Sequence, residues 1–313
     1  AYPVGGCVRD LLLGRTPGDW DVCTDARPER VMDLFPRTVP TGLKHGTVTV
    51  LTEDGPVEVT TFRREGGYAD GRHPDEVDFD ATLAEDLARR DFTVNAMALD
   101  ERGMVIDLYG GQLDLFRRLI RCVGDPDTRF AEDALRMLRA VRFAAQLGFS
   151  IEEGTLAAIK RNARRAENLS GERIKAELEK ILLSPRPELA GEALKLGLLA
   201  HLGGSPDCPD LSPLRDVPAA PIPRWRAFCR LTGFPITSLP VERSLRRGVL
   251  HPEVEAVRAL ALSGGELAAL GLEGEAIGAM QRRLAAHILA HPEDNTREKL
   301  LALVSGGQST ETP

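Results

Sequence analysis

The pattern of apolar and polar positions divides the chain into two parts. In the first third, apolar and polar residues alternate in short runs. The runs TVTVL at 47–51 and VEVTTF at 57–62 are typical of strands, joined by a turn at EDGP. The run LLLG after GGCVRD predicts a short helix that ends at Gly14. We therefore expect a first part of mixed α and β structure.

From about Asp125 onward the pattern has the period of a helix. The segment DTRFAEDALRMLRAVRFAAQLGF contains no Pro or Gly before Gly148, which predicts one continuous helix that ends there. A further amphipathic helix is predicted from Ser170 to Leu183. Prolines between 206 and 223 indicate an irregular stretch, and the last residues, GGQSTETP, are expected to be disordered. This order indicates catalysis in the first part and helices that position a large substrate.

The composition is that of an ordinary globular protein, with 42% hydrophobic and 28% charged residues among 313. We find no apolar run long enough to span a bilayer and no signal peptide, so we expect a cytoplasmic protein without a membrane partner. The first residues lead directly into a motif, which leaves open a natural start upstream of Ala1. The five scattered cysteines form no C-x-x-C pair and are expected to be reduced thiols. The net charge of -7 argues mildly against nucleic acid, although a local patch can still be basic.

The segment GDWDV at 18–22 carries the first candidate chemistry. In a strand, residues i and i+2 point to one face, which would place Asp19 beside Asp21, with Trp20 and Val22 toward the core. Two adjacent carboxylates repel each other unless a cation lies between them, and oxygen ligands in this arrangement suit Mg²⁺. The alternative is a pair of solvated loop acids.

Glu58, in VEVTTF, is the candidate third carboxylate. It lies on a predicted strand from which it could reach the two aspartates. Two-metal phosphoryl transfer needs acids that bridge both metals and help to deprotonate the attacking hydroxyl. An exposed strand glutamate is the alternative.

Two segments offer groups that bind a nucleotide. Gly5 and Gly6 precede a helix and let backbone amides approach a phosphate, while Arg9 adds a positive charge for a triphosphate. The alternative is a tight turn with a surface pair between Arg9 and Asp10. In the second segment, LARRDFTVNA at 87–96, arginines can clamp phosphates and polar side chains can reach a ribose hydroxyl, unless they form a surface ion-pair cluster. Its candidates are Arg90, Asp91 and Asn95, beside Arg89.

The segment EDALRMLRAVRF at 132–143 is apolar on almost every face and is therefore expected to be buried. Charged residues nevertheless recur at every third position: Asp133, Arg136, Arg139 and Arg142. Buried charges are costly unless they are paired. Asp133 and Arg136 are helical neighbours that offer acceptors and donors at a fixed separation, which suits the edge of a base. A structural salt bridge is the alternative.

A second basic cluster follows that segment and consists of Lys160, Arg161, Arg164 and Arg165. Such a cluster is most often a solvated helix face. The alternative is a surface that contacts RNA phosphates, whose binding would fall steeply with salt.

Together these segments resemble the class II tRNA nucleotidyltransferases, the bacterial CCA-adding enzymes and their poly(A) polymerase relatives, over about the first 190 residues. GGCVRDLLLGRTPGDWDV is similar to the catalytic motif of the family, RRDFTVNA to its ribose-selecting motif and DLYGG at 107–111 to its hinge-like motif. EDALRMLRAVRFAAQLGF resembles its nucleotide-templating helix, and ERIKAELEKIL at 172–182 the helix that braces it. Five motifs in this order make chance similarity a poor explanation.

The resemblance implies an α+β head with the polymerase-β-like nucleotidyltransferase fold, followed by an all-helical neck, body and tail. We expect the head at 1–124, the neck at 125–187, the body at 188–250 and the tail, with a disordered C-terminus, at 251–313.

The resemblance also implies a reaction, the addition of C and A to the 3′ end of tRNA from CTP and ATP. It implies two Mg²⁺ ions at Asp19 and Asp21. It further implies that Asp133 and Arg136 read the incoming base by mimicking Watson–Crick pairing, so that no template strand is needed. The triphosphate would be held by Gly6, Arg9, Arg90, Arg139 and Arg142.

The subtype depends on two further segments. TGLKHGTVTV resembles the tRNA-specific branch, and 64–86 resembles the full-length loop of CCA-adding enzymes, which CC-only enzymes usually shorten. Glycines and a proline at Gly66, Gly67, Gly71 and Pro74 make 64–80 poorly suited to fixed structure, so we expect a lever that reorients the templating helix. CCA addition is favoured. An A-only or CC-only transferase, a poly(A) polymerase, a small-molecule nucleotidyltransferase and a non-catalytic RNA-binding protein remain alternatives.

Overall fold

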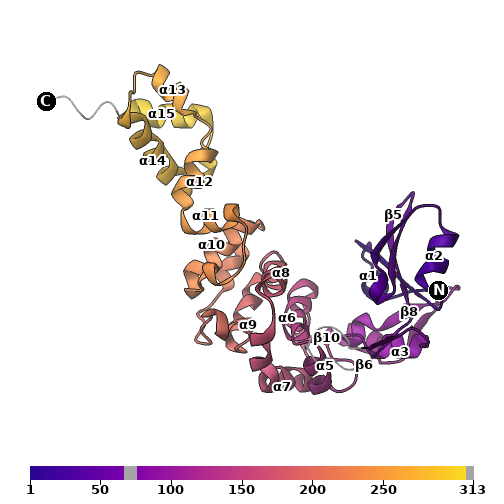
Figure 1. Cartoon of the computed structure of the whole chain (residues 1–313). Coiled ribbons are helices and arrows are strands. Elements are labelled where there is room, and N and C mark those ends of the chain that lie inside the picture. Colours follow the sequence, from indigo (N-terminus) through magenta and orange to yellow (C-terminus); the bar gives the residue numbers. More distant parts are fainter. Residues whose placement is uncertain (67–75, 308–313) are drawn as a thin grey trace.

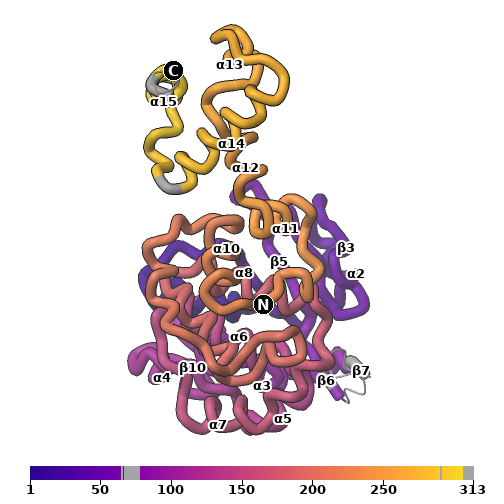
Figure 2. The backbone as a smooth tube through the Cα atoms, turned by 90° about the vertical axis from the view of Figure 1, so that its left-hand side faces the viewer, coloured from indigo at the N-terminus to yellow at the C-terminus, as the bar shows by residue number. Residues whose placement is uncertain are grey.

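The computed structural model describes residues 1–66 and 76–307. The chain follows a curved path in which an α/β head is succeeded by helices, and the head turns back toward the middle of the helical part (Figure 1). The last helices stand apart from the rest of the molecule when it is seen from the side (Figure 2). This division into a mixed head and a helical remainder confirms the expected fold class.

The head is built on a five-stranded sheet of order β1-β2-β5-β4-β3, in which β2 and β5 run parallel and their other neighbours antiparallel. Valines that alternate along the strands, among them Val48, Val50 and Val59, pack against Val31 of the helix that covers them. The two expected strands are confirmed as β4 and β5. The bounds are β1 Tyr2–Pro3, β2 Trp20–Thr24, β3 Thr38–Gly42, β4 Thr47–Thr52, β5 Gly55–Thr61 and, for the covering helix, α2 Pro28–Leu34.

The remaining head elements are short and surround this sheet. The helix expected from LLLG begins earlier, at Gly6, and ends at Leu12, two residues before Gly14. The paired strands β6 and β7 lie at the ends of the segment for which we expected no fixed structure, so that expectation is wrong for their residues. Gly67, Gly71 and Pro74 lie outside the described residues. The bounds are α1 Gly6–Leu12, β6 Arg64–Gly66, β7 Glu76–Asp78, α3 Leu83–Ala88, β8 Met97–Leu99, β9 Val105–Asp107, α4 Gly111–Arg117 and β10 Leu119–Ile120, with 3-10 turns at Leu43–His45 and Thr93–Asn95.

The neck corrects one prediction. The long helix expected from 127 to 148 is two helices, because Asp133 adopts an extended conformation between them. Its carboxylate accepts a hydrogen bond at 3.0 Å from the amide of Leu135, the first residue of the second helix. An aspartate side chain that binds the backbone in this way can interrupt a helix without any Pro or Gly. Gly148 ends that helix as expected, with a φ of 74°. The bounds are α5 Pro126–Glu132, α6 Leu135–Leu147, β11 Ser150–Ile151, α7 Glu153–Asn162 and α8 Gly171–Leu182, with a 3-10 turn at Ala163–Asn168.

One hydrophobic core runs from the head through the neck into the body, whereas the tail has a core of its own. The expected domain limits at 124, 187 and 250 therefore stay predictions. The irregular stretch expected at 206–223 is confirmed up to residue 220, where it holds only a 3-10 turn, but the expectation is wrong for 221–223, which begin α10. None of the helices among the described residues is long and apolar enough to cross a membrane. The bounds are α9 Ala190–Lys195, α10 Pro221–Thr232, α11 Arg243–Leu250, α12 Pro252–Ala259, α13 Gly264–Ala269, α14 Glu275–Ala290 and α15 Arg297–Gly307.

Candidate active site

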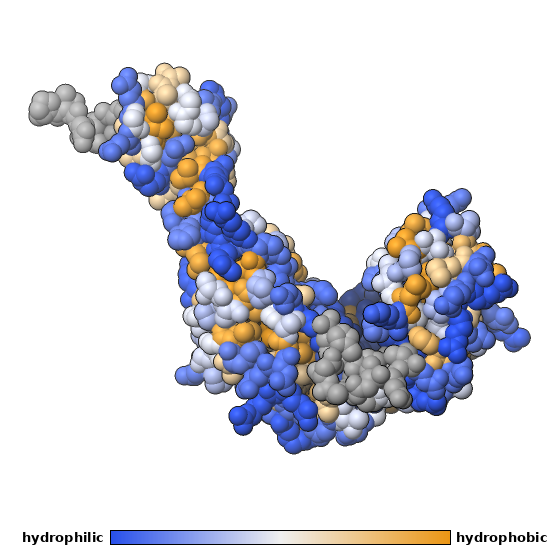
Figure 3. Space-filling view, in the orientation of Figure 1, coloured by the Kyte–Doolittle hydropathy of each residue, from blue (hydrophilic) through white to orange (hydrophobic). Residues whose placement is uncertain are grey.

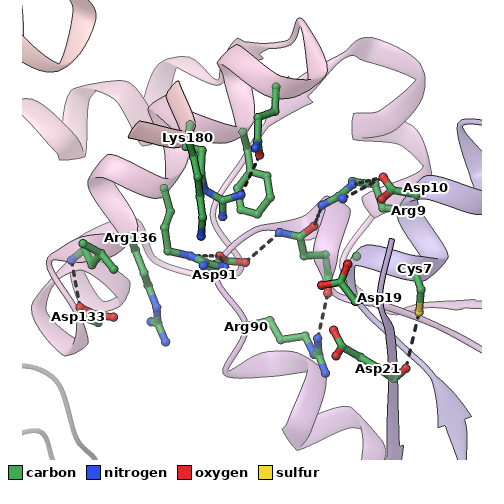
Figure 4. A pocket seen from close by; sticks show the side chains of 18 of the residues that line it. Cys7, Arg9, Asp10, Asp19, Asp21, Arg90, Asp91, Asp133, Arg136 and Lys180 are labelled. Carbon is green, nitrogen blue, oxygen red and sulfur yellow. Dashed lines mark hydrogen bonds and ion pairs between the residues drawn. The ribbon is translucent and has the colours of Figure 1, made fainter. Parts of the chain in front are cut away.

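The aspartate pair lies where β2 begins. Asp19 directly precedes the strand, Asp21 is its second residue, and both side chains line one cavity (Figure 4). Trp20, which we expected in the core, is exposed instead, while Val22 packs against the core of the sheet. Trp20 is the first residue of β2 and belongs to neither of the two core clusters beside the sheet.

Glu58 lies next to Asp21 on β5, in register with it across the parallel pair. Burial raises the pKa of the Asp21 carboxyl; Arg90 lowers it, and the neighbouring charges of Glu58 and Asp19 raise it. Glu58 is exposed and does not line the cavity. The structure therefore places it next to Asp21 in the sheet, but not in the cavity that the two aspartates share. An all-oxygen site with excess negative charge fits a hard divalent cation, which would reverse that pKa shift.

Gly5 allows a close approach between the start of α1 and the arginine of the second motif. Gly5 has a φ of 81°, and a Cβ atom there would lie 2.7 Å from Nη1 of Arg90. Arg90 is anchored by Asp86, whose Oδ2 lies 3.3 Å from its Nη2. The buried Nε of Arg90 has no acceptor among the described residues. Gly6 opens α1 and lines the same cavity.

A buried network joins the head to the neck across this cavity. Arg9 donates from Nη1 to Oδ1 of Asn95 at 2.7 Å, and Asn95 donates to Oδ1 of Asp91 at 3.2 Å. Arg139 of α6 then donates to Oδ2 of Asp91 through Nε at 2.8 Å and Nη2 at 2.5 Å. Burial would raise the pKa of Asp91, but the charge and hydrogen bonds of Arg139, with the Asn95 bond, lower it to about 2. Asp91 is thus held as a carboxylate.

Arg9 also pairs with Asp10 at 2.8 Å, the contact that the alternative interpretation of this segment predicted. The pair is not a surface feature, because Arg9 is buried and both residues line the cavity.

The side chains of Asp133 and Arg136 do not pair with each other, but each forms a salt bridge with another residue, as the structural alternative for this segment predicted. Asp133 receives two hydrogen bonds from Arg173 of α8, at 3.1 and 2.8 Å. Arg136 is ion-paired to Glu132 and donates to the carbonyl of Arg89 at 3.1 Å. Both side chains nevertheless line the cavity, at the end away from Asp19 and Asp21, with Asp91 between (Figure 4).

The cavity has a volume of about 740 Å³, within the range of ligand sites in proteins. Eight Arg or Lys side chains and five aspartates line it, so this region is locally basic although the chain as a whole is acidic. All ten residues expected to bind a nucleotide meet here: Gly5, Gly6, Arg9, Arg90, Asp91, Asn95, Asp133, Arg136, Arg139 and Arg142.

Sequence reasoning missed several residues of the lining. Arg173 and Lys180 lie seven residues apart on α8, two helical turns on one face, and this spacing was the signal that could have placed them. Phe143 and Gln146 belong to α6, a segment in which we selected only charged residues as nucleotide contacts. Arg142 is buried and donates to Glu177 of α8 at 2.5 Å and to Gln146 at 2.8 Å.

The second basic cluster lies elsewhere. Its four residues are exposed, on the end of α7 and the turn after it, and none lines the cavity. Arg161 pairs with Asp127 of α5 at 2.6 Å, and Arg165 donates to Asn162. Helix α7 lies at the foot of the neck, away from the opening between head and body (Figure 1). The surface at the foot of the neck is strongly hydrophilic (Figure 3). A role of this cluster in RNA binding stays a prediction.

Comparison with known families gives two matches. Residues 1–121 match the poly A polymerase head domain, and residues 148–207 match the probable RNA and SrmB-binding site of polymerase A. The first match covers the sheet, the aspartate pair and the second motif. The second match begins where α6 ends.

Individual relatives extend the likeness over more of the chain. A CCA-adding enzyme of Geobacillus kaustophilus is 55% identical over 208 residues, 65% of this chain and 51% of the relative, so the chain spans about half the length of the curated relatives it matches. A Bacillus stearothermophilus CCA-adding enzyme solved in complex with CTP is 33% identical, with a TM-score of 0.64 over 98% of this chain and 93% of that one. A tRNA nucleotidyltransferase complexed with a primer tRNA and an incoming ATP analog is 32% identical, with a TM-score of 0.54 over 64% of this chain and 58% of that one.

The motifs, the fold and the cavity agree with these likenesses. The aspartate pair lies in the part of the chain that matches the head domain, and the solved relative is similar over nearly the whole chain. The chain therefore belongs to the tRNA nucleotidyltransferase family of the CCA-adding enzymes and poly(A) polymerases.

Proposed function

We propose that this chain adds C and A nucleotides from CTP and ATP to the 3′ end of tRNA without a template. The observation that supports this most directly is the single cavity that joins an aspartate pair to ten candidate nucleotide-binding residues from both head and neck. The relatives support the choice of substrates, since one was solved with CTP and another with a primer tRNA and an ATP analog. We place the reaction in the cytoplasm.

The aspartate pair is proposed as the metal site. Asp19 and Asp21 would hold Mg²⁺, which when bound supplies positive charge to the phosphates and lowers the pKa of the attacking hydroxyl. The raised pKa of Asp21, which follows from burial and from Glu58 and Asp19, supports this choice, because a cation relieves that excess negative charge. Glu58 is proposed as the third catalytic carboxylate, acting from beside the pair.

The triphosphate is proposed to lie against the arginines between the aspartate pair and α6. Arg9, Arg90, Arg139 and Arg142 all line this part of the cavity. The buried Nε of Arg90 has no acceptor among the residues described, and a phosphate oxygen would satisfy it. Asp91 and Asn95, which the network orients, are proposed to contact the ribose hydroxyls.

The base is proposed to meet Asp133 and Arg136. Cytosine and adenine both offer an exocyclic amine beside a ring-nitrogen acceptor, so Asp133 can accept from the amine and Arg136 can donate to the ring. Uracil and guanine have a carbonyl in place of the amine, which would face the carboxylate oxygen to oxygen. Oδ1 of Asp133 already accepts from Arg173 and from the Leu135 amide, but among the described residues Oδ2 accepts from Arg173 alone. The second lone pair of Oδ2 can take the base amine, so the base need not displace Arg173.

For the tRNA we propose the cluster Lys160, Arg161, Arg164 and Arg165 as a phosphate contact. It lies within the residues matched to the probable RNA-binding site of polymerase A. Lys160 and Arg164 have no ion-pair partner among the described residues, which leaves both charges available.

The decisive experiment supplies tRNAs that lack the last three, two or one nucleotides, each with labelled CTP or ATP. CCA addition predicts C on the first two ends and A on the third. C on the first two without A would mean a CC-only enzyme, and A on the third alone an A-only enzyme. Repeated A on any RNA end would mean a poly(A) polymerase, and no transfer to any end would refute the proposal.

A further inference from the structure

One aromatic ring lies at the centre of the basic part of the cavity. Phe143 of α6 is buried, with 6% of its surface exposed, and lines the cavity. The guanidinium carbons of three arginines lie over its ring, at 3.8 Å from the centroid for Arg142, 5.3 Å for Arg139 and 5.4 Å for Arg9. Arg9 comes from the head and the other two from the neck, so the ring lies where the two parts meet.

Three like charges this close repel one another, and each needs a compensating contact. Each guanidinium has polar anchors along its edges: Asn95 and Asp10 for Arg9, Asp91 for Arg139, and Glu177 and Gln146 for Arg142. These anchors lie on different elements and hold only the edges. The face of an aromatic ring attracts cations, and more strongly where water is excluded. The ring of Phe143 therefore supplies an attractive contact in addition to the anchors, which hold only the edges of the guanidiniums.

The ring is itself held in place. Phe92 contacts it edge to face, with centroids 5.7 Å apart and planes at 79°. Two of the three arginines, which all line the cavity, keep a nitrogen without a hydrogen bond within the described part of the chain: Nη1 of Arg139 and Nη2 of Arg142. A fixed ring in contact with guanidiniums that keep open donors can present them to a polyanion.

We propose that Phe143 is a positioning residue that orients Arg9, Arg139 and Arg142 for the triphosphate, through its electron-rich face as well as its bulk. This inference rests on the proposed function only in taking the ligand to be a nucleoside triphosphate. The competing explanation is that Phe143 merely fills the core, to which it also belongs.

The test replaces Phe143 by mono-, di- and trifluorophenylalanine, which weaken the negative face of the ring stepwise with little change in volume. We expect the Kd for CTP and for inorganic tripolyphosphate to rise with each fluorine, to about fivefold to tenfold in the trifluoro protein. The Kd for CMP, kcat at saturating CTP and Tm should change little. Phe143→Tyr should retain most of the affinity, and Phe143→Leu should lose at least as much as the trifluoro protein.

The matched control is the same series at Phe228, a buried body residue whose ring contacts only Trp225 and Phe234 among the aromatic and cationic contacts described. That series should leave both Kd values unchanged. If the wild-type protein binds CTP and the Kd values are equal along the Phe143 series, the inference is overturned and Phe143 only fills the core. If the wild type transfers no nucleotide, the proposed function fails, yet the tripolyphosphate series still decides whether the ring orients the arginines.

Discussion

Helix α6 and the end of α7 with its following turn carry similar numbers of basic residues in very different surroundings. The arginines of α6 interrupt an apolar helix and pair with acids from other elements, Asp91 and Glu177 among them. Those of α7 lie on a polar face and use a surface partner or none. The side chain of Arg142 is 10% exposed and that of Arg161 58%. A charge within an apolar pattern is therefore the more informative signal, because burial forces it to find a distant partner.

The largest expected effect separates the acids inside the cavity from those outside. Asp21→Ala should reduce both C and A addition by several orders of magnitude, because the proposed metal site would carry most of the charge stabilisation. Asp127→Ala removes the partner of Arg161 and should leave turnover nearly unchanged. Single-turnover rates on one tRNA measure both. Near-normal turnover of a folded Asp21→Ala protein would sink the metal assignment.

Next in size is the stability of the two ion pairs. Glu177→Leu leaves Arg142 buried without its carboxylate and should lower the free energy of unfolding by about 3 kcal/mol. Asp127→Leu leaves Arg161 in water and should not shift the denaturation midpoint measurably. Urea denaturation compares the two. Equal midpoints would mean that the α6 arginine is no more dependent on its partner than the α7 arginine.

The choice of base should depend on α6 and on Asp133, which lies just before it. Asp133→Ala removes the acceptor for the exocyclic amine and should reduce discrimination against UTP by about tenfold to hundredfold. The relevant quantity is kcat/KM for all four nucleotides on one tRNA, with Tm recorded because Asp133 also accepts a hydrogen bond from the first residue of α6. If Asp133→Ala keeps full discrimination, selection occurs elsewhere.

Acid should test the Asp91–Arg139 pair. The pKa of Asp91 is about 2 in the folded protein, below its usual 3.8, so the pair stabilises the fold above about pH 4. That contribution, on the order of 2 kcal/mol, is lost as the pH falls from about 4 toward 2. Unfolding at a series of pH values should show a shallower acid slope for Asp91→Asn. An unchanged slope would show that Asp91 is not strongly coupled to Arg139.

The smallest effect concerns the α7 surface. Replacing Lys160, Arg161, Arg164 and Arg165 by Gln should raise KM for tRNA several-fold and leave KM for CTP nearly unchanged. The dependence of tRNA affinity on salt should weaken by about one unit of log–log slope for each phosphate that the variant no longer neutralises. If the variant has the same KM for tRNA and the same salt slope as the wild type, the cluster is only a solvated helix face.

The sequence by itself determined much of this protein. Local periodicity was enough for β4, β5 and the end of α6 at Gly148, because alternation and a glycine with positive φ act within a few residues. Motif spacing was enough to select residues that do share one cavity.

Only the tertiary structure decided which groups those residues meet. Asp133 ends one helix, accepts a hydrogen bond from the first residue of the next and binds Arg173, which lies 40 positions away in the sequence. Trp20 is exposed although the strand period predicted it in the core, and Glu58 stays outside the cavity although it is in register with Asp21. The ring of Phe143 gathers arginines from head and neck. Each of these outcomes depends on contacts between distant segments, and a local pattern specifies how a segment folds but not which surface packs against it.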